Sequence, residues 1–323
     1  MAERRLRAEI PADLAGQRFD QILPRLFRGY SRAYLAGEVR GGRITLDGGN
    51  VPPRTLVRGG ETVEWQHAEE PAIGDQPEAI DLAVVFEDEH LIVLDKPAGL
   101  VVHPGAGNRT GTLLNALLHH DPGLARIPRA GIVHRLDKDT SGLLVVARSL
   151  PAHTALTRML AAREIHRRYA AVVDGVPVAG GTVDAPIDRH PSDRLRRAVR
   201  EGGRPAVTHY RVRERFRAHA LLQCELESGR THQIRVHMAH AGFPLVGDPL
   251  YGKGLRLPRG AMPELVEALR GFRRQALHAE RLAFAHPVIG KAMAFDADPP
   301  RDLLDLLAAL REDAHAPAGP GGR

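Results

Sequence analysis

Two carboxylates, Asp137 and Asp139, lie among basic residues in the stretch 131–142, whose sequence is GIVHRLDKDTSG. The apolar run LLVVA at 143–147 follows at once and predicts a buried strand. A carboxylate beside such a strand can act as a nucleophile, as a metal ligand or as an acid that shapes a turn. The residue types by themselves leave these three chemistries open.

Two specific kinds of site fit these acids poorly. A calcium-binding loop that starts at Asp137 requires a bidentate Glu at its twelfth position, where this chain has Arg148. An aspartyl-phosphate phosphatase requires a strongly apolar strand directly before its first Asp, whereas His134 and Arg135 stand close before it here. The simplest remaining alternative is that both acids only shape or cap a turn.

Three longer motifs resemble those of the large-subunit ribosomal RNA pseudouridine synthases. They are HRLDKDTSGL at 134–143, LDKPAGLVVHP at 94–104 and GRTHQIRVH at 229–237. Two shorter segments, VGDPLYG at 246–252 and RHP at 189–191, resemble the subtype called synthase D. The resemblance covers residues 16–310, and the motifs occur in the family's order, so we expect the fold and activity of that family.

The resemblance implies a catalytic role for three residues. Asp137 is expected to be the nucleophile, while Asp139 is expected to be a turn acid. Arg235 is expected to keep Asp137 ionised, because a neighbouring cation favours the charged form of a carboxyl group. Residues 231–241 have a helical pattern that places Arg235 beside the apolar face. Tyr169 is expected to stack on the target base and to accept a proton, although a tyrosine in a strand is more often a core residue.

Further residues are expected to contact the substrate. Arg135 would fill the gap that the target uridine leaves when it swings out of the base stack. Lys96 would support the site or contact a phosphate. The remaining residues that we expect to contact the substrate are His134, Ile234 and Arg230.

Neither a cofactor nor a metal ion is expected. Pseudouridine formation moves the bond between base and ribose from nitrogen to carbon within one nucleotide, so no atom is gained and no redox change occurs. His232, His237 and His240 suggest zinc at first sight. The five-residue spacing from His232 to His237 does not suit ligands on one helical face, and no nearby Cys completes a set.

The charge of the chain predicts a polyanionic partner. Its 45 Lys and Arg residues outnumber 39 Asp and Glu residues, which gives a formal net charge of +6 and a pI of about 9.9. Arginines are dense at 189–217, which predicts a surface that faces RNA beside the active site. The residues expected to bind RNA are Arg28, Arg32, Arg40, Arg43, Arg196 and Arg197.

The chain is predicted to contain two domains. Residues 16–67 resemble the small α/β RNA-binding domain of S-four type, and residues 68–81, with prolines and acids, predict a linker. Residues 82–311 predict the catalytic domain, an α+β fold around a largely antiparallel mixed sheet, because strands often follow one another directly. Residues 312–323, rich in Ala, Pro and Gly, predict a disordered tail.

The expected partner is 23S ribosomal RNA, in the large ribosomal subunit or its precursor, and the synthase D resemblance implies helix 69 as the target. No window approaches the length of about 20 apolar residues that a membrane helix needs, and residues 1–10 are charged and lack the apolar core of a signal peptide. We therefore expect a cytoplasmic protein. We also expect a monomer. The single cysteine, Cys224, excludes an intramolecular disulfide and is expected to fill the core.

A non-catalytic protein that binds ribosomal RNA during assembly is the alternative function. A basic surface and an RNA-binding domain would suffice for such a protein. The carboxylate distinguishes the two functions, because a protein that only binds RNA has no need of Asp137 beside Arg235.

Overall fold

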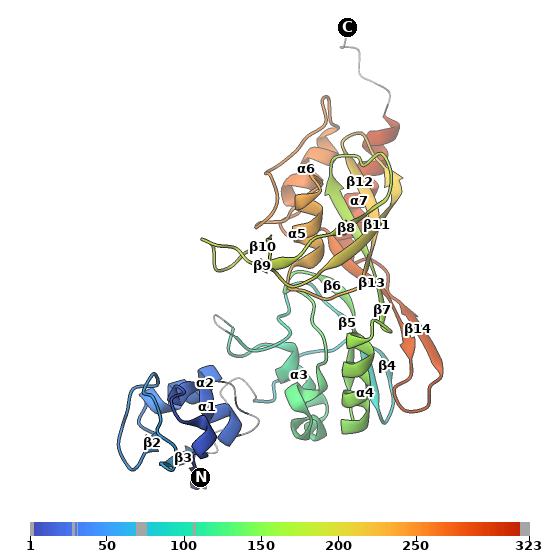
Figure 1. Ribbon diagram of the computed structural model, residues 1–323. Coiled ribbons are helices and arrows are strands. Elements are labelled where there is room, and N and C mark those ends of the chain that lie inside the picture. Colours follow the sequence, from blue (N-terminus) through green and yellow to red (C-terminus); the bar gives the residue numbers. More distant parts are fainter. Residues whose placement is uncertain (1–2, 28–29, 31, 69–75, 106–107, 317–323) are drawn as a thin grey trace. The chain divides into compact units, whose positions relative to one another are not determined.

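The computed structural model describes residues 3–27, 30, 32–68, 76–105 and 108–316. The chain divides into two compact units, Met1–Ile73 and Gly74–Arg323 (Figure 1). The division falls inside the predicted linker, 68–81.

The first unit is a small α/β unit with a three-stranded antiparallel sheet in the order β1-β3-β2. Its elements are β1 (Glu3–Glu9), the 3-10 helix η1 (Ala12–Leu14), α1 (Phe19–Leu26), α2 (Arg32–Arg40), β2 (Ile44–Leu46) and β3 (Thr62–Ala68). Its core gathers around Trp65, which is fully buried. The Trp65 indole Nε1 donates a hydrogen bond of 3.2 Å to Glu38 Oε2, which satisfies the polar end of the ring.

The predicted start of this unit, residue 16, is wrong. Strand β1 pairs along its whole length with β3, from Glu3 opposite Ala68 to Glu9 opposite Thr62. The composition of this strand does not indicate a strand, because only Leu6 and Ala8 are apolar and pack against the core, while the other five residues are Glu or Arg.

The second unit is built on a nine-stranded mixed sheet among the residues described. Its strands are β4 (Val84–Glu87), β5 (Leu91–Lys96), β6 (Ser141–Ala147), β7 (His166–Asp174), β8 (Gly181–Asp184), β11 (Val207–Arg215), β12 (His219–Leu226), β13 (Leu277–Ala285) and β14 (Ala292–Asp296). The order is β4-β5-β6-β13-β7-β12-β11-β8, with β14 on β13. The β6–β13 pair is parallel, and the other pairs of this sheet are antiparallel, which confirms the predicted α+β fold.

Helices cover both faces of this sheet. On one face lie α3 (Leu113–His120) and α5 (Gln233–His240), together with the 3-10 helices η2 (Pro122–Arg126) and η3 (Pro128–Gly131). On the other lie α4 (Leu150–Ala161), α6 (Pro263–Gly271) and α7 (Arg301–His315). Side chains alternate between the faces along a strand, so in β7 Tyr169 packs on the α3 and α5 side while Ala170 packs on the α6 and α7 side. Cys224 is buried in the core, as expected.

Two predicted boundaries of the second unit are wrong. The linker was expected to reach residue 81, but Asn115 Nδ2 donates to the carbonyl of Gln76 at 2.7 Å, and the carboxylate of Glu78 accepts the N–H of Gly111. The disordered tail was expected from residue 312, but α7 continues to His315. Its buried Asp313 accepts hydrogen bonds from Arg217 Nη1 and from the backbone N–H of Met262, which holds the last turn in place.

A separate hairpin joins β9 (Ile187–Arg189) to β10 (Arg197–Val199). It lies within the arginine-rich segment 189–217 and outside the main sheet.

Gly142 allows the close approach of β6 and β13 that places the loop before β6. Its φ of +113° is in the region that favours glycine, and a Cβ there would lie 2.3 Å from the carbonyl oxygen of Ala279. Gly142 pairs with Ala279 in the parallel register of the two strands.

We predict that Gly142→Ala lowers the free energy of unfolding of the second unit by about 3 kcal/mol or more, because the methyl group meets backbone and the φ is strained. The chain has one tryptophan, Trp65 in the first unit, so its fluorescence follows that unit while far-UV circular dichroism follows both. The dichroism transition should move to lower denaturant with the fluorescence transition unchanged. Gly271→Ala, with no atom near its added Cβ, is the matched control. A Gly142→Ala chain as stable as the control would contradict the prediction.

Candidate active site

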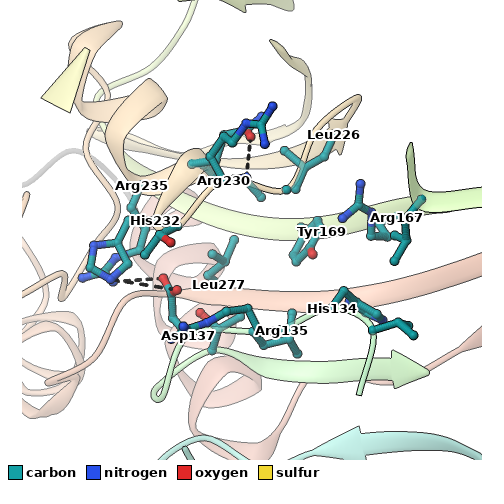
Figure 2. A pocket seen from close by; sticks show the side chains of 18 of the residues that line it. His134, Arg135, Asp137, Arg167, Tyr169, Leu226, Arg230, His232, Arg235 and Leu277 are labelled. Carbon is teal, nitrogen blue, oxygen red and sulfur yellow. Dashed lines mark hydrogen bonds and ion pairs between the residues drawn. The ribbon is translucent and has the colours of Figure 1, made fainter. Parts of the chain in front are cut away.

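A cavity of about 320 Å³ lies beside β7 in the second unit. It collects residues from the loop before β6, from β7 and from the segment that enters α5, with a few from elsewhere (Figure 2). Seven residues predicted from sequence line it: His134, Arg135, Asp137, Tyr169, Arg230, Ile234 and Arg235. The fold therefore brings together motifs that are about 100 residues apart in the chain.

Buried contacts hold the loop of Asp137 in place. The N–H of Thr140 donates to the carbonyl of Asp137 at 3.1 Å, and the Thr140 hydroxyl accepts from Gln275 Nε2 at 3.0 Å. Arg274 Nη1 donates to the carbonyl of Asp139 at 3.2 Å. Arg274 and Gln275 lie within three residues of the start of β13, so the parallel pairing of β6 and β13 helps to fix the loop.

Lys96 supports this loop from beneath and does not line the cavity. It is 1% exposed, and its ammonium donates to three carbonyl oxygens, those of Pro97, Leu100 and Lys138, at 2.7 to 3.0 Å. Burial lowers the pKa of Lys96 to about 8, against the opposing charges of Asp139 and Asp137. Of the two roles expected for Lys96, these contacts fit support of the site, because carbonyls of the fold occupy its donors.

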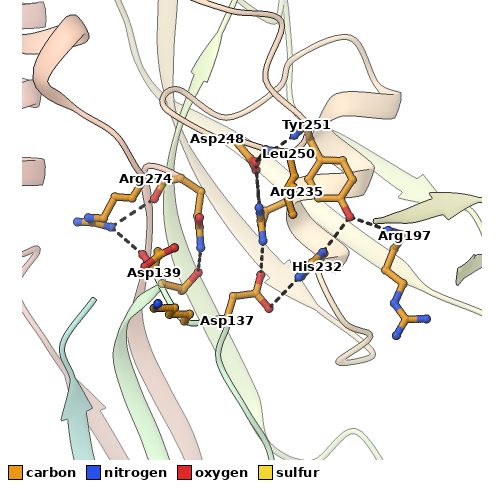
Figure 3. A network of polar contacts seen from close by, with 12 residues as sticks. Asp137, Asp139, Arg197, His232, Arg235, Asp248, Leu250, Tyr251 and Arg274 are labelled. Carbon is orange, nitrogen blue, oxygen red and sulfur yellow. Dashed lines mark hydrogen bonds and ion pairs between the residues drawn. The ribbon is translucent and has the colours of Figure 1, made fainter. Parts of the chain in front are cut away.

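Arg235 lies between two carboxylates, as Figure 3 shows. Its Nη1 donates to Asp137 Oδ2 at 3.0 Å, while Nε and Nη2 donate to the two oxygens of Asp248 at 2.7 and 2.9 Å. Burial disfavours the Arg235 cation, but the hydrogen bonds and charges of Asp248 and Asp137 outweigh it and raise its pKa above the ordinary value. Asp137 has the expected cation beside it, yet the planar fork of the guanidinium holds Asp248 and not Asp137.

Asp248 is the residue that sequence reasoning missed. Its Oδ1 also accepts the backbone N–H groups of Leu250 and Tyr251, at 2.9 and 3.0 Å. These bonds fix Asp248 in its own turn, and its two bonds to Arg235 then fix the orientation of the guanidinium. The only signal in the sequence was the motif at 246–252, which pointed to a subtype and gave no role to its acid.

Tyr169 extends from β7 into the cavity (Figure 2). It is 5% exposed, so its ring belongs to the core as well as to the cavity wall. Burial raises the pKa of Tyr169 above its ordinary value; the charge of Arg167 opposes this, and that of Asp137 adds to it. The phenol is therefore neutral in the free protein.

His134 lines the cavity as a neutral imidazole. Its Nε2 accepts the N–H of Val145 at 3.1 Å, and burial, with the nearby charge of Arg167, lowers the pKa of His134 to about 3. The neutral ring then carries its proton on Nδ1, a buried atom that has no hydrogen-bond partner among the described residues.

Unpaired cations surround the cavity. Arg129, Arg135 and Arg167 line it and form no ion pair within the described residues, and Arg230 Nε donates only to the carbonyl of Pro205. Arg135 is exposed to solvent. Such a ring of arginines attracts an anionic ligand.

The arginines expected to bind RNA elsewhere have mixed environments. Arg32 pairs with Asp20 at 2.8 Å and Arg43 with Glu38 at 2.6 Å, whereas Arg40 is exposed and Arg28 lies outside the described residues. In the segment 189–217, Arg213 and Arg217 form ion pairs with Glu280 and Asp313. The density of arginines there is thus partly structural.

Arg196 and Arg197 lie against Tyr251. The guanidinium carbon of Arg196 is 5.4 Å from the centre of the Tyr251 ring, and the backbone N–H of Arg197 donates to the Tyr251 hydroxyl at 2.8 Å.

The described part of the chain contains no group of three or more His, Cys, Asp or Glu residues that could hold a metal ion. His237 instead bonds within the fold, to the Thr208 hydroxyl at 2.9 Å and the Ala185 carbonyl at 3.0 Å. None of the described helices combines the length and apolar character that crossing a membrane requires.

This chain is similar in sequence to proteins of one family. The model of the RNA pseudouridylate synthase family matches residues 90–240. The ribosomal large subunit pseudouridine synthase D of Xanthomonas campestris pv. campestris is 60% identical over 307 residues, which cover 95% of this chain and 93% of the relative. The protein of the same description from Pseudomonas aeruginosa is 54% identical over 313 residues, 97% of this chain and 98% of the relative.

A solved structure, Human RNA Pseudouridylate Synthase Domain Containing 4, superimposes with a TM-score of 0.56 at 25% identity, covering 71% of this chain and 93% of that chain. Similarity in sequence over nearly the whole length thus accompanies similarity in fold. On these grounds the chain belongs to the RNA pseudouridylate synthase family.

Proposed function

We propose that this enzyme converts uridines of large-subunit ribosomal RNA to pseudouridine with Asp137 as its nucleophile. This proposal rests on the contacts that the Asp137 carboxylate makes in the cavity. One oxygen accepts from Arg235 at 3.0 Å, while the other, Oδ1, lies 4.0 Å from His232 Nε2. A carboxylate beside a guanidinium, with one oxygen that accepts no hydrogen bond from the described residues, is suited to form and release a covalent adduct.

The reaction needs few groups. The bond between N1 of uracil and C1′ of ribose breaks, the base turns within the cavity, and C5 forms the new bond to C1′. C5 then loses a proton and N1 ends with one, so the reaction is an isomerisation. We propose that Asp137 holds an adduct with the base or the sugar in between.

Tyr169 is proposed to stack on the target base. Its raised pKa keeps the phenol neutral before RNA binds, which suits stacking. To accept the C5 proton, the hydroxyl must first pass on its own proton. Ile234, 4% exposed, supplies apolar surface in the same cavity.

The unpaired cations are proposed to receive the RNA backbone around the extruded nucleotide. An enzyme that acts on a base must take that base out of the stack, which leaves a gap in the RNA. Arg135 is exposed at the cavity and would fill that gap. Arg129, which is exposed, and Arg230, which is half-buried, have no acidic partner among the described residues and are free to pair with phosphates.

The substrate is proposed to be 23S ribosomal RNA, in the large subunit or its precursor, with helix 69 as the target. The names of the relatives support the large subunit, and the motif at 246–252 supports the subtype. We place the enzyme in the cytoplasm as a monomer and propose that the first unit, through its S-four-type segment 16–67, docks the RNA.

A non-catalytic role in ribosome assembly is the weaker alternative. Burying ionised groups costs several kcal/mol for each ion. A protein that only binds RNA gains nothing from placing Asp137 and Arg235 in a cavity, whereas a nucleophile gains a fixed orientation.

We predict that Asp137→Asn abolishes isomerisation and leaves RNA affinity within about threefold, because the amide keeps the shape but is a far poorer nucleophile. The measurement is tritium release from ribosomal RNA that carries [5-³H]uridine, beside a binding titration. Asp139→Asn is the matched control and should retain most of its turnover. Residual turnover near that of the unchanged enzyme would show that the nucleophile is another residue.

We predict that Arg235→Lys lowers turnover at saturating RNA by about 100-fold, because an ammonium cannot hold Asp248 at two points and Asp137 at a third. RNA affinity should change little. Asp248→Asn should act in the same direction by loosening the guanidinium. In contrast, Arg230→Lys at the cavity edge should weaken binding and leave saturated turnover nearly normal. If Arg235→Lys behaved like Arg230→Lys, Arg235 would be a phosphate ligand only.

We predict that removal of residues 1–73 weakens binding of ribosomal RNA while turnover at saturating RNA persists. The second unit, which starts at Gly74, contains the whole cavity. The logarithm of the affinity should fall less steeply with salt concentration, because fewer phosphates are neutralised. A folded but inactive truncated enzyme would place part of the catalytic site in the first unit.

A further inference from the structure

A line of polar contacts leads from the β9–β10 hairpin to the free oxygen of Asp137 (Figure 3). The backbone N–H of Arg197 in β10 donates to the Tyr251 hydroxyl at 2.8 Å. That hydroxyl lies 2.8 Å from His232 Nδ1. On the far side of the ring, His232 Nε2 lies 4.0 Å from Asp137 Oδ1.

One arrangement of donors and acceptors along this line also gives the Tyr251 hydroxyl proton an acceptor. A backbone N–H only donates, so the Tyr251 hydroxyl accepts from Arg197. Among the described residues, His232 Nδ1 is the acceptor that remains for the hydroxyl proton. A neutral His232 that accepts at Nδ1 carries its proton on Nε2, so an N–H group faces Asp137. Burial lowers the pKa of His232, against the charge of Asp137, and so favours the neutral ring.

The backbone of His232 is held in an uncommon conformation. Its φ of 60° and ψ of 20° are left-handed, where residues other than glycine are rare. His232 precedes the first residue of α5, but its side chain makes no capping hydrogen bond to the helix. The side chain contacts Tyr251 and faces Asp137 instead. Strained residues of this kind cluster at functional sites.

Tyr251 also contacts the other side of the ion pair. Its ring centre lies 5.1 Å from the guanidinium carbon of Arg235, and its backbone N–H donates to Asp248 Oδ1. The Tyr251 ring packs edge to face against the His232 ring, and the two ring centres lie 5.7 Å apart. Tyr251 is 7% exposed, so these contacts are shielded from water. One buried side chain thus contacts Arg235, the residue that holds Asp137 Oδ2, and His232, the residue that faces Oδ1.

We propose that Tyr251 and His232 are positioning residues for the nucleophile. The Tyr251 hydroxyl sets the tautomer of His232, and His232 Nε2–H then fixes the direction of Asp137 Oδ1. An approach of about 1 Å brings Nε2 and Oδ1 to hydrogen-bond distance. RNA held by the hairpin at Arg196 and Arg197 would act on Tyr251, which couples substrate binding to alignment of Asp137. The proposal rests on the proposed role of Asp137.

The decisive variant is Tyr251→Phe, which removes the hydroxyl and keeps the ring against Arg235. We expect kcat to fall about tenfold or more, because a misdirected carboxylate loses the reactive geometry, with RNA affinity unchanged within twofold. Tyr210→Phe in β11, outside the cavity, is the matched control and should keep the kcat of the unchanged enzyme. Thermal unfolding of both variants checks that they fold. An unchanged kcat in Tyr251→Phe would overturn the proposal.

The imidazole ¹⁵N resonances of His232 give a second readout that does not depend on catalysis. They are assigned from the signals that disappear in His232→Asn, a replacement that tolerates the left-handed backbone. We expect a protonated Nε2 and an unprotonated Nδ1, and a loss of this preference in Tyr251→Phe. The opposite tautomer, or a lower kcat with an unchanged tautomer, would also overturn the proposal. If instead Asp137→Asn stayed active, the proposed nucleophile would fail while the tautomer result still stood.

Discussion

One buried guanidinium organises the active site of this enzyme. Arg235 divides its donors between Asp248, which takes two, and Asp137, which takes one. A buried cation costs free energy unless its partners satisfy it. Asp248 is the main partner of Arg235, and two backbone N–H groups in turn fix the carboxylate of Asp248. Asp137 is therefore left with a nearby positive charge and with one oxygen that accepts no hydrogen bond from the described residues.

The rest of the second unit brings three chain segments to this guanidinium. The loop before β6 carries Asp137, α5 carries Arg235, and the turn at 246–252 carries Asp248. The loop rests on Lys96, whose ammonium occupies three carbonyls, and is held from the side by residues that precede β13. Arg274 and Gln275 make two of these contacts from just before β13, and the loop lies just before β6. The parallel pairing of β6 with β13, in a mostly antiparallel sheet, therefore brings the loop next to both residues.

The arginines of this chain fall into two groups, those that form ion pairs within the fold and those at the cavity that form none within the described residues. Arginines such as Arg213, Arg217 and Arg32 form ion pairs that hold strands and helices together. Those at the cavity, Arg129 and Arg167 among them, form none within the described residues. The net charge of +6 therefore indicates a polyanionic partner but does not map the surface that meets it. Partners within the fold decide which arginines remain available to phosphates.

The sequence by itself determined the family and the α+β class, because these depend on contiguous motifs and on local patterns of apolar residues. The resemblance to the family also pointed to Asp137, Tyr169 and Arg235 as candidate site residues. The resemblance paired Arg235 with Asp137, but only the tertiary structure placed Asp248 on the guanidinium and Lys96 against the carbonyls of the loop. Asp248 and Lys96 act through contacts with other segments, 13 residues away at Arg235 and 42 residues away at Lys138, and no single segment reveals how the fold brings such segments together. Strand β1 was missed for a related reason, since its pairing with β3, and not its own composition, makes it a strand.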